Sequence, residues 1–174
     1  MPLSPCTLLP ASCPSLLRLA SCHALRTGVP FQKKKENPMP TIRETYLGDL
    51  RVECEHVASG TKIITDAPVD NQGKGEAFSP TDLCATALGA CAMTIMGIWA
   101  RKNGVDIVGA TVEITKHMSA SPRRIGKVEV IFNMPAKGYT EEQKQAMIDA
   151  ANGCPVKLSL HPEAEQVFTF NWAE

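Results

Sequence analysis

The hydrophobic and polar positions after residue 40 fall first into three short segments typical of β-strands. Residues 42–47, 50–56 and 62–65 alternate between apolar and polar or are rich in β-branched residues, which is the pattern of half-buried strands. The segments are separated by Gly48-Asp49 and Ser59-Gly60, which are common turn residues. The pattern predicts a meander of three strands, followed by a loop over residues 67–78 that is long enough to be functional or mobile.

The next segment predicts a long helix. Ser79 is a good N-cap, Pro80 suits the first helical position, and Asp82 lies near the positive helix end. Residues 83–100 carry no charge, and Arg101, Lys102 and Gly104 suit a helix C-terminus. A helix that is apolar all round is either buried or spans a membrane. Its 18 uncharged residues are at the lower limit for a span, and strand-like segments flank it, so we predict a buried central helix.

The remaining segments predict two strands, two helices and a last strand. Residues 108–116 and 127–133 have strand patterns, with a turn expected over residues 122–126. Thr140 and Gln143 form a capping box for a helix that ends near Gly153, and a short helix begins at Cys154-Pro155. Residues 167–172 form a final strand with its aromatic side chains on one face. This order of elements predicts an α+β fold rather than a doubly wound sheet.

Composition divides the chain at Met39. Residues 1–38 hold six prolines, five basic side chains and one acid, a net charge of +4, whereas the rest holds 13 basic and 17 acidic residues, a net of −4. We interpret residues 1–38 as a leader, either an organelle transit peptide or a misassigned start, and residues 39–174 as one domain. The location is then cytoplasmic, or an organelle if the leader is a transit peptide. A mildly acidic domain is not expected to bind nucleic acid.

Cysteine usage indicates a reducing compartment. The chain has seven cysteines, an odd number, with no C-x-x-C spacing, and three of them (Cys6, Cys13 and Cys22) belong to the leader. The histidines and cysteines do not have zinc-like intervals, so no metal site is predicted. Cys54 and Cys84 are interpreted as core or incidental residues.

Two cysteines stand where a reactive thiol is plausible. Cys154 is at a predicted helix start, where unpaired amides and the helix dipole favour a thiolate, so simple rules select it as the easier thiolate. Cys91 lies about three turns inside the long helix and would need a cation or donor brought by tertiary structure. Both cysteines could equally be small core residues, because free cysteine is one of the most buried residue types.

Two sequence motifs resemble those of the OsmC/Ohr family. The first is Ser79-Pro80-Thr81-Asp82-Leu83 followed by Ala87-Leu88-Gly89-Ala90-Cys91, and the second is Gly153-Cys154-Pro155-Val156 with Ser159-Leu160. The resemblance spans nearly all of residues 39–174, and the order of elements agrees. It implies an OsmC-like fold with antiparallel sheets around the long buried helix, in an intertwined homodimer with active sites at the subunit interface.

The resemblance also implies an activity. Cys91 would be the peroxidatic nucleophile of an organic hydroperoxide reductase, and Cys154 would resolve its sulfenic acid as a disulfide. No bound cofactor is implied. The reductant would be an external dithiol of the dihydrolipoyl type, such as one carried by a lipoylated protein. The partners implied are a second copy of the chain and an organic hydroperoxide, with no nucleic acid and no membrane.

The sequence departs from the peroxidase motif at one position. Peroxidase members carry a glutamate where this chain has Thr81, and Asp82 follows it. Arg51 and Arg43 are the candidates for the arginine that activates the nucleophile, with Asp82 as a candidate acid or a plain helix-start residue. Two alternatives therefore stay open: a redox or binding protein without the full activating network, and, more remotely, a membrane-attached protein that uses residues 83–100.

Overall fold

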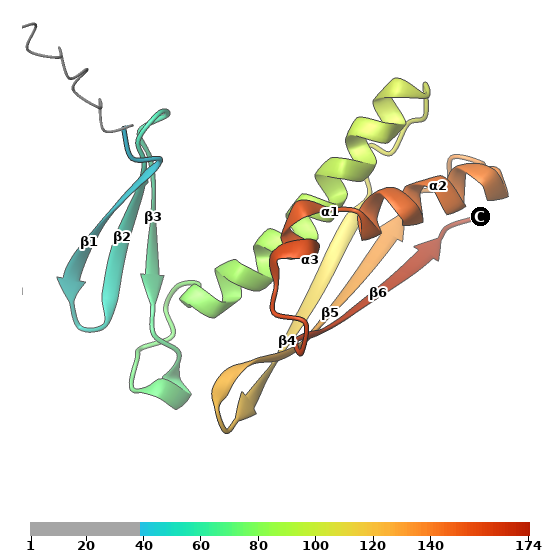
Figure 1. Ribbon diagram of the computed structural model, residues 1–174. Coiled ribbons are helices and arrows are strands. Elements are labelled where there is room, and N and C mark those ends of the chain that lie inside the picture. Colours follow the sequence, from blue (N-terminus) through green and yellow to red (C-terminus); the bar gives the residue numbers. More distant parts are fainter. Residues whose placement is uncertain (1–38) are drawn as a thin grey trace, which may run out of the picture. The chain divides into compact units, whose positions relative to one another are not determined.

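A computed structural model of the chain describes residues 39–174, so the predictions made for the leader lie outside the described part. This part contains two three-stranded sheets, three α-helices and one short 3-10 turn (Figure 1). The mixture of separate sheets and helices confirms the α+β class.

The first sheet is the predicted antiparallel meander. Its strands are β1 (Ile42–Gly48), β2 (Arg51–His56) and β3 (Thr61–Asp66), in that spatial order. The β1–β2 turn has positive φ angles at Gly48, Asp49 and Leu50, and Gly60 has a φ of +70° in the next turn. Glycine and aspartate adopt positive φ angles more readily than most residues, so both turns could be predicted from the sequence.

The long helix α1 (Pro80–Lys102) begins and ends where the sequence predicted. Ser79 accepts a hydrogen bond from the amide of Asp82, whose carboxylate accepts one from the amide of Ser79, so the N-terminal capping box is complete. Within the single chain the helix is buried along one face only, which contains Ala85, Leu88, Ala92 and Met96. The single chain therefore buries this one face of the predicted central helix.

The second sheet contains β4 (Thr111–Ala120), β5 (Arg123–Met134) and β6 (Glu165–Trp172), in that order. β4 and β5 are antiparallel, whereas β6 runs parallel to β5. The expected antiparallel pairing therefore holds for the first sheet and for β4–β5, but not for the β5–β6 pair. A parallel neighbour needs a crossover connection, which α2 (Glu141–Asn152) and α3 (Pro155–Ser159) provide.

The β4–β5 hairpin is tighter than its sequence suggested. The turn expected over residues 122–126 is wrong, because Arg123 and Arg124 already pair with Ala120 and Ser119 of β4. Basic residues and Gly126 suggested a loop, but they are tolerated at the end of a strand pair that is partly exposed to solvent. A register shift between His117 and Met118 marks a bulge in the same hairpin.

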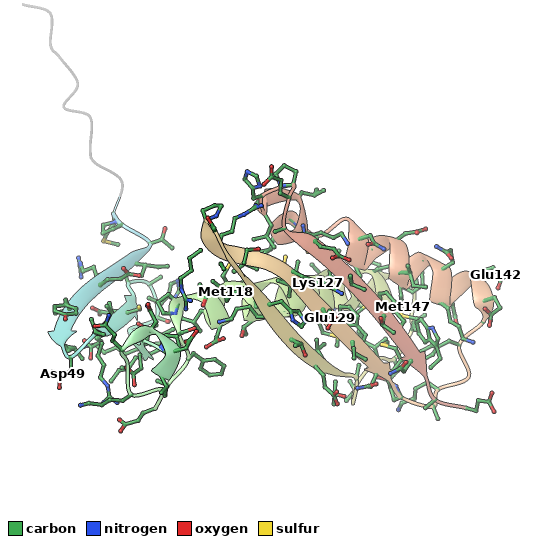
Figure 2. The ribbon with its side chains drawn as sticks, turned by 90° about the horizontal axis from the view of Figure 1, so that it is seen from below. Asp49, Met118, Lys127, Glu129, Glu142 and Met147 are labelled. Carbon is green, nitrogen blue, oxygen red and sulfur yellow. The ribbon has the colours of Figure 1, made fainter. Side chains whose placement is uncertain are left out.

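The main core lies between the second sheet and the helices. Alternate residues of β5 (Val128, Val130 and Phe132) are fully buried with Leu88 and Met96 of α1 and Met147 of α2. The intervening β5 residues point outward, and Lys127 and Glu129 form an ion pair there (Figure 2). On β6, Phe168 and Phe170 pack on Phe132, with ring centroids 5.4 and 4.7 Å away, which confirms the predicted aromatic face.

Helix α1 is the segment of residues 39–174 that has the length and hydropathy of a membrane span, and a third of its most apolar 18-residue window is buried. The central helix of a soluble protein passes the same test, so this property does not separate the two possibilities.

Candidate functional site

Cys91 and Cys154 lie next to each other where α3 packs on α1. Cys154 is the N-cap residue of α3 and is completely buried. Cys91, in the middle of α1, is partly buried and packs against the same core cluster. The Cys91 thiol is close enough to contribute to the titration of Cys154. The fold therefore brings together the two thiols that the sequence motifs singled out.

Burial controls the protonation of Cys154. Desolvation raises the pKa of the Cys154 thiol, and the Cys91 thiol raises it further, against hydrogen bonds from the amides of Lys157 and Val156 that lower it. Burial therefore opposes the thiolate that the simple sequence rules favoured at Cys154. A helix of five residues has little dipole, and the loss of hydration outweighs the favourable amides.

Cys91 borders an exposed strip of α1 that has no charged residue. The strip, called here the α1 stripe, consists of Ala87, Ala90, Thr94 and Ile98, which follow one another at helical spacing and are all exposed. Ile98 is 44% exposed in the single chain. The buried face and the α1 stripe lie on different sides of the helix, and neither carries a charge.

Arg51, the candidate activating arginine, is engaged elsewhere in the chain. Its guanidinium donates to the buried carboxylate of Asp66 (3.3 Å), the last residue of β3, and to Glu76 in the loop between β3 and α1. Hydrogen bonds from the Glu76 amide and from Arg51 lower the pKa of Asp66 in spite of burial. Within residues 39–174 Arg51 forms no hydrogen bond with either thiol, and Arg43 is exposed on β1.

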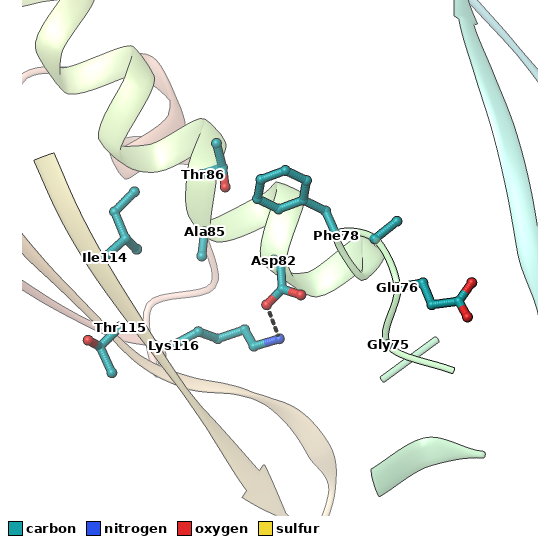
Figure 3. Close-up of a pocket in the computed structure, with 10 residues that line it drawn as sticks. Gly75, Glu76, Phe78, Asp82, Ala85, Thr86, Ile114, Thr115 and Lys116 are labelled. Carbon is teal, nitrogen blue, oxygen red and sulfur yellow. Dashed lines mark hydrogen bonds and ion pairs between the residues drawn. The ribbon is translucent and has the colours of Figure 1, made fainter. Parts of the chain in front are cut away.

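The sequence reasoning missed Lys116 of β4, whose ammonium contacts the N-terminal turn of α1. Its ammonium donates to Asp82 Oδ1 (2.7 Å; Figure 3). It also donates to Thr81 Oγ1 (2.7 Å) and more weakly to Ser79 Oγ (3.4 Å). Only 15% of the Lys116 side chain is exposed. A signal was present, because Lys116 continues the inward-facing series of Val112 and Ile114 on β4. A lysine in such a series calls for a partner.

The contacts of Lys116 and Ser79 decide the ionisation of Asp82. Partial burial raises the pKa of this carboxyl, but hydrogen bonds from Lys116 and from the Ser79 side chain and amide outweigh it and hold the pKa at about 2. Asp82 is therefore both a helix cap and an ion-pair partner. Thr81, at the position of the family glutamate, accepts a hydrogen bond from the same ammonium.

A cavity of about 640 Å³ opens beside this ion pair (Figure 3). Its walls are the loop from Gly75 to Phe78, the first turns of α1, and the segment of β4 that carries Lys116. The lining includes acidic, basic and apolar side chains. No group of His, Cys, Asp or Glu side chains in residues 39–174 has a geometry that could hold a metal ion.

The fold and the paired thiols define a class: α+β domains with one cysteine in a long central helix and a second at the start of a short helix packed on it. Comparison with known families assigns the class. The family model of OsmC-like proteins matches residues 73–166, which is more than half of the chain, and the chain belongs to this family.

Solved structures agree with the assignment. A Psychrobacter arcticus protein, provisionally described as an osmotic-stress-induced and detoxification-response protein, is 47% identical (TM-score 0.74), with 76% of this chain and 96% of that chain covered. An OsmC-like protein from Mycoplasma pneumoniae is 14% identical (TM-score 0.66; 79% and 99% covered). An organic hydroperoxide resistance protein from Elizabethkingia anophelis is 19% identical (TM-score 0.62; 79% and 99% covered). The last two show a shared fold only. No curated protein matches the chain.

Proposed function

We propose that this protein is a cysteine-based peroxidase that reduces organic hydroperoxides. The Cys91 thiolate attacks the terminal oxygen of ROOH, so the O–O bond breaks, ROH leaves after protonation, and Cys91 becomes a sulfenic acid. Cys154 then attacks the Cys91 sulfur, which forms the disulfide and releases water. An external dithiol of the dihydrolipoyl type reduces the disulfide, is itself oxidised to a disulfide, and restores both thiols.

The observation that carries the proposal is the proximity of the two thiols. Cys91 contributes to the titration of Cys154, although the two belong to helices far apart in the sequence. A nucleophilic thiol with a second thiol nearby is the arrangement that a sulfenic acid needs for resolution. The apolar cluster around both cysteines favours an organic hydroperoxide over hydrogen peroxide. Relatives described as organic hydroperoxide resistance and detoxification proteins support the same function.

We further propose that the active form is a homodimer. The α1 stripe leaves exposed one side of a helix that has no charge between residues 83 and 100, and Cys91 lies at its edge. A second copy that covers this stripe would remove apolar surface from water and enclose the thiols.

The direct test measures consumption of cumene hydroperoxide by the full chain with dihydrolipoamide as reductant. We expect C91S to abolish turnover, and C154S to lose the disulfide while still forming a sulfenic acid at Cys91. C84S is a matched control, because Cys84 is another partly buried thiol of α1, seven residues earlier, and should retain the activity. Turnover that survives in C91S would exclude Cys91 as the nucleophile and remove the proposal.

A second candidate is a redox or binding protein without peroxidase turnover. The observation in its favour is the engagement of Arg51 with Asp66 and Glu76, together with Thr81 in place of the family glutamate. This alternative predicts a folded protein that consumes no hydroperoxide and whose Cys91 is alkylated by iodoacetamide no faster than Cys84. Rapid, selective alkylation of Cys91 would argue against it.

A further inference from the structure

Lys157 holds an unusual place beside the buried thiol. It is the third residue after Cys154, and its amide donates a hydrogen bond of 3.3 Å to Cys154 Sγ. Its side chain is half-buried and crosses to β6, where the ammonium nitrogen lies 4.0 Å from the centre of the Phe168 ring. The side-chain amide of Gln166, also on β6, donates from Nε2 to the Lys157 carbonyl (3.2 Å) and so holds the backbone of the same residue.

The charge of Lys157 is not neutralised by an acid. Within residues 39–174 no carboxylate lies within ion-pair distance of its ammonium, whereas the other half-buried lysine described above, Lys116, is bound to Asp82. Burial lowers the pKa of Lys157, and the only charge effect that opposes it comes from Cys154. A half-buried cation over an aromatic ring is tolerated because the ring face is negative. Cys154, whose sulfur accepts from the Lys157 amide, is thus the ionisable neighbour that this unneutralised charge can act on.

We propose that Lys157 is a positioning residue for Cys154, whose ammonium stabilises the thiolate that resolves the oxidised Cys91. The proposal rests on the peroxidase function above. In that step the Cys154 thiol loses its proton, its sulfur forms the S–S bond with Cys91, and the S–O bond of the sulfenic acid breaks. The hydroxide takes up a proton and leaves as water, and Lys157 stays protonated throughout. Lys157 thus opposes the effect of burial on the resolving thiol.

None of the other groups described around Cys154 supplies a positive charge that is free to stabilise its thiolate. From α1 the neighbouring titratable group is the Cys91 thiol, which disfavours a Cys154 thiolate. From β6 the neighbours of Lys157 are Phe168 and Gln166, which carry no charge. After α3, His161 and Glu163 both contact Arg124 of the hairpin.

The decisive experiment is a titration of Cys154 in the absence of peroxide. The ultraviolet absorbance of the thiolate is followed against pH in C91S and in C91S/C154S, and the difference isolates Cys154 from the other cysteines and tyrosines. In the same background we expect K157M to move this titration to higher pH by about one unit, because an opposite charge nearby is removed. K157R keeps the charge and should stay close to the parent.

K144M is the matched control. Lys144 also lies over an aromatic ring, at 5.8 Å from the centre of Trp172, but it forms an ion pair with Glu141 on α2. Its loss should leave the Cys154 titration unchanged. If K157M does not keep the circular dichroism of the parent, K157Q replaces it. An unchanged titration in the folded neutral variant, or an equal shift in K157R, would overturn the role of the charge.

Kinetics separate this proposal from the peroxidase function. With Cys91 present, K157M should slow disulfide formation by up to about tenfold, in proportion to the lost thiolate, while the preceding formation of the sulfenic acid keeps its rate. A protein that consumes no hydroperoxide can still show the shifted titration, which would remove the peroxidase function and keep the charge effect. An active peroxidase whose Cys154 titration does not shift in K157M would keep the peroxidase function and remove the charge effect of Lys157.

Discussion

Asp82 combines two roles that the sequence could show only in part. Its Oδ2 accepts from the amide (2.8 Å) and hydroxyl (2.6 Å) of Ser79, and its Oδ1 accepts from Lys116. The first role follows from local rules, because a residue three positions after a serine cap reaches back to it. The second depends on a lysine on a different element, and only tertiary structure brings it near.

The carboxyl of Asp82 should make stability depend on acid. Because its pKa is lowered to about 2 in the folded chain, it stabilises the fold above its unfolded pKa of about 3.9, and this contribution is lost as the pH falls through about 2. We expect D82N to lower the free energy of unfolding at neutral pH by about 1 kcal/mol, a value discounted for solvent screening. The difference from wild type should shrink as the pH falls from about 4 towards 2.

Urea unfolding at several pH values measures this effect. D149N is the matched control, since Asp149 is an exposed carboxylate of α2 that accepts from the side chain of Gln145. A D82N difference that stays the same at neutral and acid pH would show that Lys116 contributes no charge-dependent stability.

The sequence identified the two cysteines but did not predict the protonation of Cys154. The motifs selected both cysteines, and the structure places them together. The protonation of Cys154 could not be predicted, because it depends on complete burial and on Cys91. The contribution of Lys157 was equally hidden, since three-residue spacing does not reveal that its ammonium turns towards Phe168.

Helix α1 and strand β4 approach each other closely at Gly89. A β-carbon added at Gly89 would lie 2.6 Å from Ile114 Cδ1 and 3.2 Å from Val112 Cγ1, so the missing side chain lets the helix approach the strand without displacing these two residues. The approach places the part of α1 that carries Cys91 against the core.

We expect G89A to destabilise the chain. Alanine would force Ile114 and Val112 to move, and overpacking of this kind costs about 1–3 kcal/mol, more than the gain of about 1 kcal/mol from alanine's better helix propensity. G97A is the control in the same helix, because an added β-carbon there has its nearest neighbour at 3.9 Å. Denaturant unfolding compares the two variants; equal or greater stability of G89A would contradict the close contact.

The elements themselves were largely predictable, because the signals are local. Both capping boxes, Ser79 with Asp82 and Thr140 with Gln143, form as expected. The errors concern β6 and the β4–β5 turn. The direction of β6 depends on how α2 and α3 cross the sheet, and the place of the turn depends on pairing across the hairpin. Neither appears in the periodicity of a single segment.

At the scale of the whole molecule, two of the places where apolar surface is exposed bear on assembly. In the first sheet Ile63 and Ile64 are 47% and 46% exposed, and because successive strand residues point to opposite faces, both faces of the sheet retain apolar surface. A three-stranded sheet is near the lower limit for independent stability, so this one benefits from another surface to pack on. The second place is the α1 stripe.

At this scale the fold class and the family were predictable from the sequence, whereas the partner was not. The α+β class followed from the order of elements, and the family followed from two motifs in the right order. The partner could not be derived from the pattern of one chain: an uncharged helix predicts burial without saying what buries it. The single chain covers one face of α1, and the proposed second copy accounts for the other.

A charge placed in the α1 stripe tests that account. Thr94 lies near the middle of the stripe, so T94R would put a guanidinium between the two copies, where its desolvation is not offset by an acid. We expect sedimentation equilibrium to show a dimer for wild type and a shift of T94R towards monomer by at least about tenfold in the dissociation constant. T169R makes the same change at an exposed position of β6 and should remain dimeric. A wild-type monomer, or a T94R dimer as tight as that of T169R, would mean that α1 does not form the dimer contact.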